Sequence, residues 1–141
     1  KFHVISIPEQ KFERLVKFCP LTRGMLYNFV SNKEFKFTKE TEINKNHLKF
    51  LLMMPEDLLN LQNVKVGSRL FYDSLRRLMI IERFLENLSL NPIEIEKDMN
   101  LFVGESVSNK LRQNEETSDK DLARISKMIK EKLNKIKDKI K

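Results

Sequence analysis

The segment from Arg69 to Leu90 repeats apolar residues at the spacing of an α-helix, and no other feature of the sequence constrains the fold as strongly. The apolar face of this segment consists of Phe71, Leu75, Leu78, Met79, Ile81, Phe84, Leu85 and Leu88. A face this wide must be covered, so the pattern predicts a buried helix around which other elements pack. We expect the helix to end just before Pro92, because the residue before a proline disfavours the helical conformation.

The N-terminal part of the chain predicts two helices and two short strands. The spacing of apolar residues indicates one helix over Glu9–Phe18, ended by Pro20, and a second over Leu21–Val30. Residues 2–7 and residues 35–37 are rich in aromatic and β-branched side chains or alternate apolar with polar ones, as strands do. The sequence therefore predicts a mixed α+β fold that is dominated by helices, with a small N-terminal antiparallel sheet packed on a helical subdomain.

Pro and Gly residues mark the predicted boundaries of the elements in the rest of the chain. We expect Pro55 to start a helical turn or to bend the chain out of an extended segment. A short helix is expected over Asp98–Val103, and the polar composition that follows Gly104 indicates a linker over residues 105–117. Residues 1–104 would then form the domain proper, and residues 118–141 a separate basic amphipathic helix.

The expected C-terminal helix begins near Asp119, where Ser118 and Asp121 have the spacing of a capping box. Lysines occupy much of its polar side. Its apolar stripe consists of Leu122, Ile125, Ile129, Leu133, Ile136 and Ile140. Such a helix is typical of membrane surfaces, of sites that bind anionic partners and of exposed positions in bundles. Because the stripe contains no Trp or Phe, packing against a helix of the same chain or of a partner competes with lipid contact, and the stripe is a candidate docking face for a homo- or hetero-oligomer.

The net charge of +7 is distributed unevenly along the chain. Residues 1–50 hold ten Lys or Arg and five acids, a net charge of +5. Residues 51–120 hold nine and twelve, a net charge of −3, and residues 121–141 hold eight and three, a net charge of +5. We therefore expect the two ends of the chain, rather than the middle, to face an anionic partner.

Composition argues against enzymatic chemistry. The chain has three Gly, two His and the single Cys19, and no pattern of a nucleophile beside a base, of a phosphate loop or of a metal cage. Cys19 lies in an apolar run, so we interpret it as a core residue of a protein from a reducing compartment. We predict a cytoplasmic, non-enzymatic protein without cofactor or metal, and interpret the start at Lys1, without an initiator Met, as the start of an excised fragment.

Nucleic-acid binding is an alternative, which would place the protein in the nucleus. The sequence pI of about 9.5 favours it, as do Lys33, Lys36 and Lys39 interleaved with Phe35 and Phe37. A half-buried strand with a lysine-rich solvent face explains the same residues and carries more weight.

Residues 55–106 resemble the second half of a phox-homology (PX) domain of the sorting-nexin type. In that family a Pro-containing segment leads into a long helix that carries an Arg, a Phe-Leu pair and a following Pro, and then into a short helix that ends in Leu-Phe. The pattern falls here on Arg77, Phe84-Leu85, Leu88, Pro92 and Leu101-Phe102, with Ile81 in place of a Leu.

The resemblance implies a phosphoinositide- or protein-binding module of endosomal trafficking, peripheral at the membrane. By resemblance, Arg77 contacts the inositol hydroxyls and Lys65 is the basic residue of the loop that precedes the helix. Met53 and Met54 would form an apolar tip that enters the bilayer. The alternative that uses no resemblance is a helical subunit of a protein or nucleic-acid assembly, which docks through the C-terminal helix.

Overall fold

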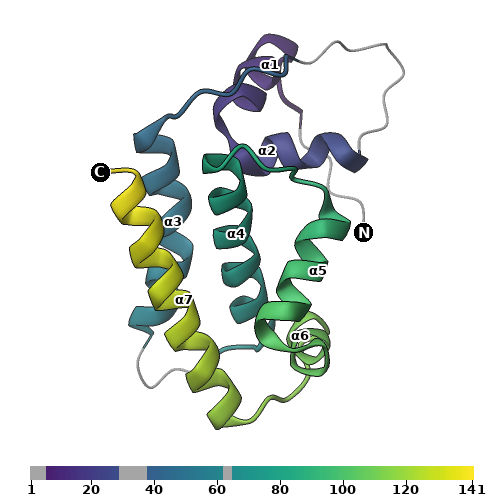
Figure 1. Cartoon of the computed structure of the whole chain (residues 1–141), viewed down its shortest axis with the longest axis vertical. Helices are drawn as coiled ribbons and strands as arrows, with labels where there is room; N and C mark the ends of the chain where they lie inside the picture. The colour runs from purple at the N-terminus through teal and green to yellow at the C-terminus, as the bar shows by residue number, and fades with distance from the viewer. Residues whose placement is uncertain (1–5, 29–37, 62–64) are drawn as a thin grey trace.

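The structure is a computed structural model of the chain, and it describes residues 6–28, 38–61 and 65–141. Within these ranges it contains seven α-helices and one short 3₁₀-helix (Figure 1). They are α1 Glu9–Phe18, α2 Pro20–Met25, η1 Leu26–Asn28, α3 Lys45–Asn60, α4 Arg69–Leu85, α5 Pro92–Val103, α6 Glu105–Arg112 and α7 Asp119–Lys139.

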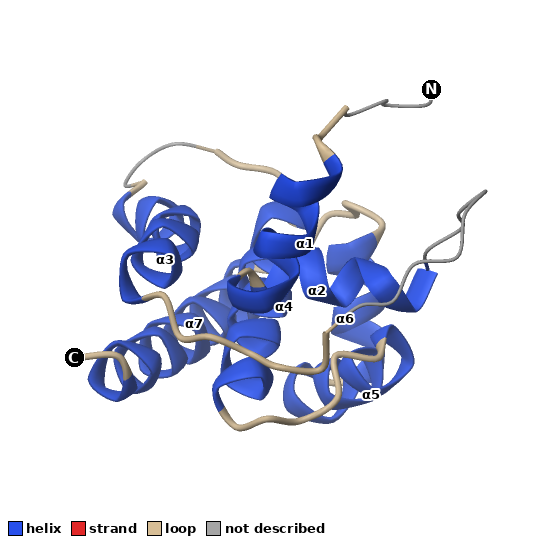
Figure 2. Cartoon of the chain, turned by 90° about the horizontal axis from the view of Figure 1, so that it is seen from above, coloured by secondary structure: helices blue, strands red, loops and turns tan. Residues whose placement is uncertain are grey.

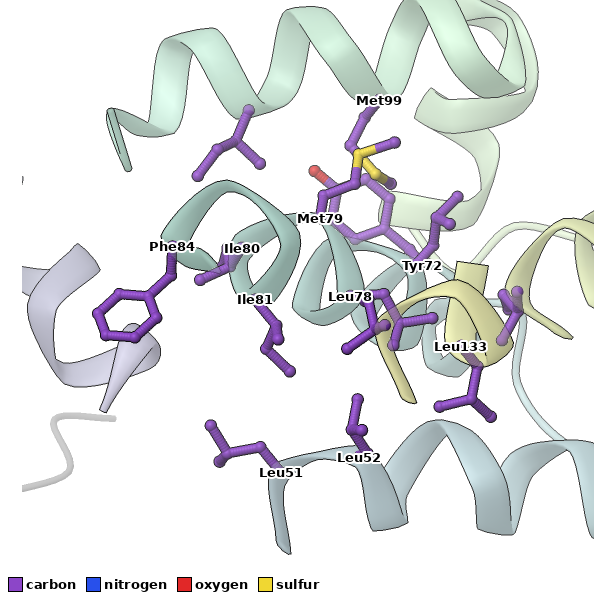
Figure 3. Packing of buried hydrophobic residues seen from close by; sticks show 14 of the residues in the cluster. Leu51, Leu52, Tyr72, Leu78, Met79, Ile80, Ile81, Phe84, Met99 and Leu133 are labelled. Carbon is purple, nitrogen blue, oxygen red and sulfur yellow. The ribbon is translucent and has the colours of Figure 1, made fainter. Parts of the chain in front are cut away.

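Helix α4 is the centre of the molecule. It lies between α3 and α7 on one side and α5 on the other, with α1 and α2 across one end (Figure 1). Figure 3 shows Leu78 of α4 above Leu52 of α3 and beside Leu133 of α7, while Met79 turns toward Met99 of α5. The predicted buried helix is confirmed.

Helix α4 ends earlier than expected, at Leu85 rather than just before Pro92. Asn87 adopts the left-handed conformation with φ 55°. The N–H of Leu88 donates to the carbonyl oxygen of Arg83 at 2.8 Å, and the N–H of Asn87 donates to the carbonyl oxygen of Phe84 at 3.2 Å. This pair of hydrogen bonds is the Schellman motif, which closes a helix through a left-handed residue, often Gly or Asn. Leu88 is consequently 49% exposed instead of continuing the buried face.

The expected α+β fold is wrong. Every regular element of the described residues is a helix, and Figure 2 shows no strand. Helices α2, α3, α5 and α7 pack on α4, so the buried faces of the central helix are covered without a sheet. The strand expected over residues 35–37 lies outside the described ranges, as does most of the one expected over residues 2–7, of which the described end is irregular.

Helix α3 runs through Pro55 instead of starting or bending there. Proline has no backbone N–H, so the carbonyl of Leu51, four residues earlier, loses its helical partner. Arg77 of α4 replaces that partner, because its Nη1 donates to the carbonyl oxygen of Leu51 at 3.3 Å. A side chain from the neighbouring helix thus satisfies the group that the proline leaves free.

The structure also differs from the expected linker over residues 105–117. Helix α6 occupies its first half and buries Ser108 and Leu111. Ser118 then caps α7 as predicted, accepting a hydrogen bond from the N–H of Asp121 at 3.2 Å. Helix α7 is therefore part of the same core as α3 and α4 rather than an appendage.

Candidate binding groove

Two adjacent hollows lie on the surface of α4 and share Met54, Leu70 and Arg77 as lining residues; together we call them the Arg77 groove. The first, of about 360 Å³, lies between α3 and α4. The second, of about 390 Å³, lies between α4 and helices α2 and α5. Arg77 is half-buried at the point where the two hollows meet.

Large apolar side chains are exposed along this groove. The exposed fractions are 60% for Met25, 64% for Phe50, 51% for Met53, 45% for Leu61 and 41% for Leu70. Each of these residues lines one or both hollows. Contiguous exposed apolar side chains on a folded domain mark interaction sites more often than isolated ones do.

Two polar groups lie inside the apolar lining. Burial lowers the pKa of the Arg77 guanidinium, the carboxylate of Asp73 opposes that shift, and the group stays charged at neutral pH. Its bond to Leu51 uses one of five N–H donors. The hydroxyl of Ser74, which also lines the first hollow, is fully buried and has no hydrogen-bond partner among the described residues. A few polar groups in an apolar groove are the usual means of orienting a ligand.

Charge around the groove is nearly balanced. Asp73 pairs with Arg69 at 2.9 Å, whereas Arg76 forms no ion pair within the described part of the chain. The net charge around the groove is +1. It is the sum over three arginines and two aspartates: Arg69, Arg76, Arg77, Asp57 and Asp73. The groove therefore suits a ligand with a single negative charge better than a multiply charged one.

The structure brings three of the predicted lipid-site residues together. Arg77, Met53 and Met54 all line the first hollow, although the prediction gave them separate roles. Lys65 is exposed in the segment before α4 and lines neither hollow. Sequence reasoning missed Ser74, even though a Ser within the apolar face of a predicted buried helix was a visible signal.

The expected docking stripe of α7 is not a free surface, which corrects that prediction. Leu122 is half-buried, and the other five residues of the stripe are in the core: Ile125, Ile129, Leu133, Ile136 and Ile140. They pack on α3 and α4 of the same chain, so the stripe closes the bundle and is not available to a partner.

In the part of the chain that the structure describes, no group of three or more His, Cys, Asp or Glu could hold a metal ion. Burial lowers the pKa of His47, whose ring meets Phe18 edge-on at 5.0 Å, so we interpret it as a packing residue between α1 and α3. Cys19 is buried, 5% exposed, as predicted for a core residue.

The remaining strong electrostatic contacts join helices to one another. Glu82 of α4 pairs with both Lys132 and Lys135 of α7. Burial disfavours its ionised form, but the hydrogen bonds and charges of the two lysines outweigh this effect and lower the pKa of Glu82. These three residues join α4 to α7.

Comparisons with known proteins found no relative that would assign a function to the groove. A scan against protein-family models gave no match, and searches of curated proteins and of solved structures gave no significant one. None of the helices within the described ranges combines the length and the apolar character needed to cross a bilayer.

Proposed function

We propose that this chain is a non-enzymatic protein-interaction module whose Arg77 groove binds an amphipathic helical segment of a partner that carries an acidic side chain. One observation carries the proposal. A charged guanidinium with unused donors lies half-buried among the exposed apolar side chains of Met53 and Leu70. An apolar groove of this kind accepts the apolar face of a helix, with anchors at positions i, i+4 and i+7.

Charge complementarity selects an acidic partner. The remaining donors of Arg77 suit a carboxylate, which a guanidinium can bind through two parallel hydrogen bonds. The hydroxyl of Ser74 supplies a further polar group in the same hollow. Arginine is one of the three residue types, with Trp and Tyr, that are enriched at interface hot spots.

A phosphoinositide headgroup, which the PX resemblance implies, is the second candidate. Exposed Phe50 and Met53 beside Arg77 favour it, since such side chains enter membranes. The net charge of +1 around the groove favours the singly charged peptide instead, and Lys65 lies outside the groove. We therefore treat lipid binding as an outcome of the test.

Selection from a displayed library of random 16-residue peptides, with the intact chain as bait, tests the proposal. We expect enriched peptides with apolar residues at helical spacing and an Asp or Glu among them. A synthetic copy of the most enriched peptide should shift the methyl signals of Met53 and Met54 in the NMR spectrum. Met53→Ser should weaken its binding about 10-fold, because it removes an apolar anchor worth roughly 1.4 kcal/mol.

Leu101→Ser is the matched control, since Leu101 is 86% exposed and lies on α5 outside the groove. It should leave peptide binding unchanged. Enriched peptides without acidic residues, or equal effects of the two substitutions, would contradict the proposal. Sedimentation with phosphatidylcholine vesicles that contain phosphatidylinositol 3-phosphate tests lipid binding. If the chain binds these vesicles and Arg77→Gln abolishes the binding, the ligand of the Arg77 groove is a lipid headgroup and not a peptide.

A further inference from the structure

A second, basic surface lies along the groove between α3 and α7, which run side by side in Figures 1 and 2, and it borders the Arg77 groove at Phe50 and Met53. A hollow of about 620 Å³ there is lined by Lys127, Lys130 and Lys137. It continues past Lys137 into a hollow of about 580 Å³, lined also by Lys49 and Lys141. We call these five residues the lysine row.

Two of the five lysines of the row have an acidic partner. Among the described residues, Glu56 is the one carboxylate that lines either hollow, and it pairs with Lys137. With Asp138, the partner of Lys141, five lysines and two acids give a local net charge of +3. Lys127 and Lys130 form no ion pair with any other described residue, whereas Lys141 pairs at 2.8 Å with Asp138 on the outer side of α7. The neutral donors Ser126 and Asn134 line the 620 Å³ hollow beside Lys127 and Lys130.

We propose that the lysine row binds the phosphate backbone of a single-stranded nucleic acid. Lys127 and Lys137 lie about 15 Å apart along α7 at a rise of 1.5 Å per residue, and Lys141 extends the row past the end of the helix. A row of this length spans several phosphates of one strand. Lysines together with neutral donors are the groups that contact phosphates without reading sequence.

Phe50 points to a single strand rather than a duplex. Phe50 is 64% exposed and lines the 580 Å³ hollow of the lysine row beside Lys49. An exposed aromatic ring beside a basic groove offers a surface on which an unpaired base can stack. Because Phe50 also borders the Arg77 groove, the test relies on the lysines, most of which lie away from that groove.

Fluorescence anisotropy with a labelled 20-residue oligothymidine and the intact chain tests this inference. We expect binding at 50 mM salt, with a slope of log affinity against log salt of about −2 for the three lysines without an ion pair. The affinity should fall about 16-fold between 50 and 200 mM salt. Duplex DNA of the same length should bind more weakly, and Phe50→Ala should weaken oligothymidine binding about 10-fold.

The decisive variant removes three exposed lysines of the row together, Lys49→Gln, Lys127→Gln and Lys130→Gln, none of which is held in an ion pair by a described residue. It should weaken binding at 50 mM salt at least 10-fold and bring the salt slope close to zero, because the two lysines that remain are held in ion pairs. The matched control removes three exposed lysines from other surfaces: Lys11→Gln, Lys97→Gln and Lys110→Gln. It should change the affinity less than about 3-fold, because the charges it removes lie away from the row.

Three results would overturn the inference. The first is no binding at 50 mM salt, and the second is an equal loss in the two triple variants, which would indicate diffuse attraction to a basic protein. The third is tighter binding of the duplex, or no effect of Phe50→Ala, which would exclude the single strand.

Discussion

Replacement of Leu133 by Ala measures how far α7 belongs to the core. Leu133 is 4% exposed, and Figure 3 shows it beside Leu52 of α3 and Leu78 of α4. The substitution removes three carbon atoms from an apolar environment, a transfer cost of about 2.4 kcal/mol at 0.8 kcal/mol per carbon. The cavity left behind adds to this cost, so we expect the free energy of unfolding to fall by about 3 kcal/mol.

Urea denaturation followed by circular dichroism at 222 nm gives this number directly, and the melting temperature should fall by about 10 °C. Leu101→Ala is the matched control, because it makes the same chemical change at a residue that is 86% exposed, and it should cost less than about 0.5 kcal/mol. If Leu133→Ala cost under 1 kcal/mol, or no more than the control, α7 would be the separate docking helix that the sequence indicated, and the packing described above would be wrong.

Two further predictions concern an ion pair and a close approach of two loops. Because the pKa of Glu82 is lowered in the folded state, its contribution to stability is complete above the ordinary carboxyl value of 4.5 and is lost as the pH falls below it. Glu82→Gln should therefore cost about 1–3 kcal/mol at pH 7 by leaving Lys132 unpaired, and should flatten the dependence of urea stability on pH below about 4.5. An added Cβ at Gly67 would lie 2.6 Å from Oδ1 of Asn114, which accepts the N–H of Arg69 at 3.1 Å, so Gly67→Ala should displace this acceptor and destabilise the chain by about 1 kcal/mol in urea. Gly24→Ala, with open space around the new Cβ, should instead stabilise α2 by about 0.5–1 kcal/mol; equal effects of the two Gly substitutions would contradict the packing of the loops.

The sequence predicted correctly the helices that have a proline or a capping residue at one end. Helix α1 covers Glu9–Phe18 as expected, because Pro20 follows an amphipathic run, and α7 begins at Asp119 behind the Ser118 cap. The end of α4 depended on Asn87, whose left-handed conformation no periodic pattern reveals.

Contacts between distant residues account for what the sequence could not predict. Helix α3 passes Pro55 because Arg77, 26 residues away from Leu51, satisfies the free carbonyl. Helix α6 was missed because few of its residues are apolar, yet Leu111 is fully buried by its neighbours.

The candidate site was predicted only in part for the same reason. The PX resemblance singled out Arg77, Met53 and Met54, and the crossing of α3 with α4 makes them one surface. Leu70 lies outside the apolar face that the sequence predicts for α4, and it is 41% exposed in the groove. Its exposure agrees with the local pattern, but its meeting with Met53 and Arg77 in one groove depends on the packing of α3 on α4.

A double-mutant cycle between Arg77 and the acidic residue of a selected peptide tests the central claim most directly. Arg77→Gln removes the charge but keeps an N–H group for the carbonyl of Leu51, and the peptide change is Glu or Asp to its amide. The cycle cancels any general loss of stability, and isothermal titration gives the four affinities. We predict a coupling energy of about 1.5 kcal/mol or more, as expected for a hydrogen-bonded charge pair in an interface. Additive effects, with a coupling within about 0.3 kcal/mol of zero, would show that Arg77 does not bind the acidic side chain and would contradict the proposed function.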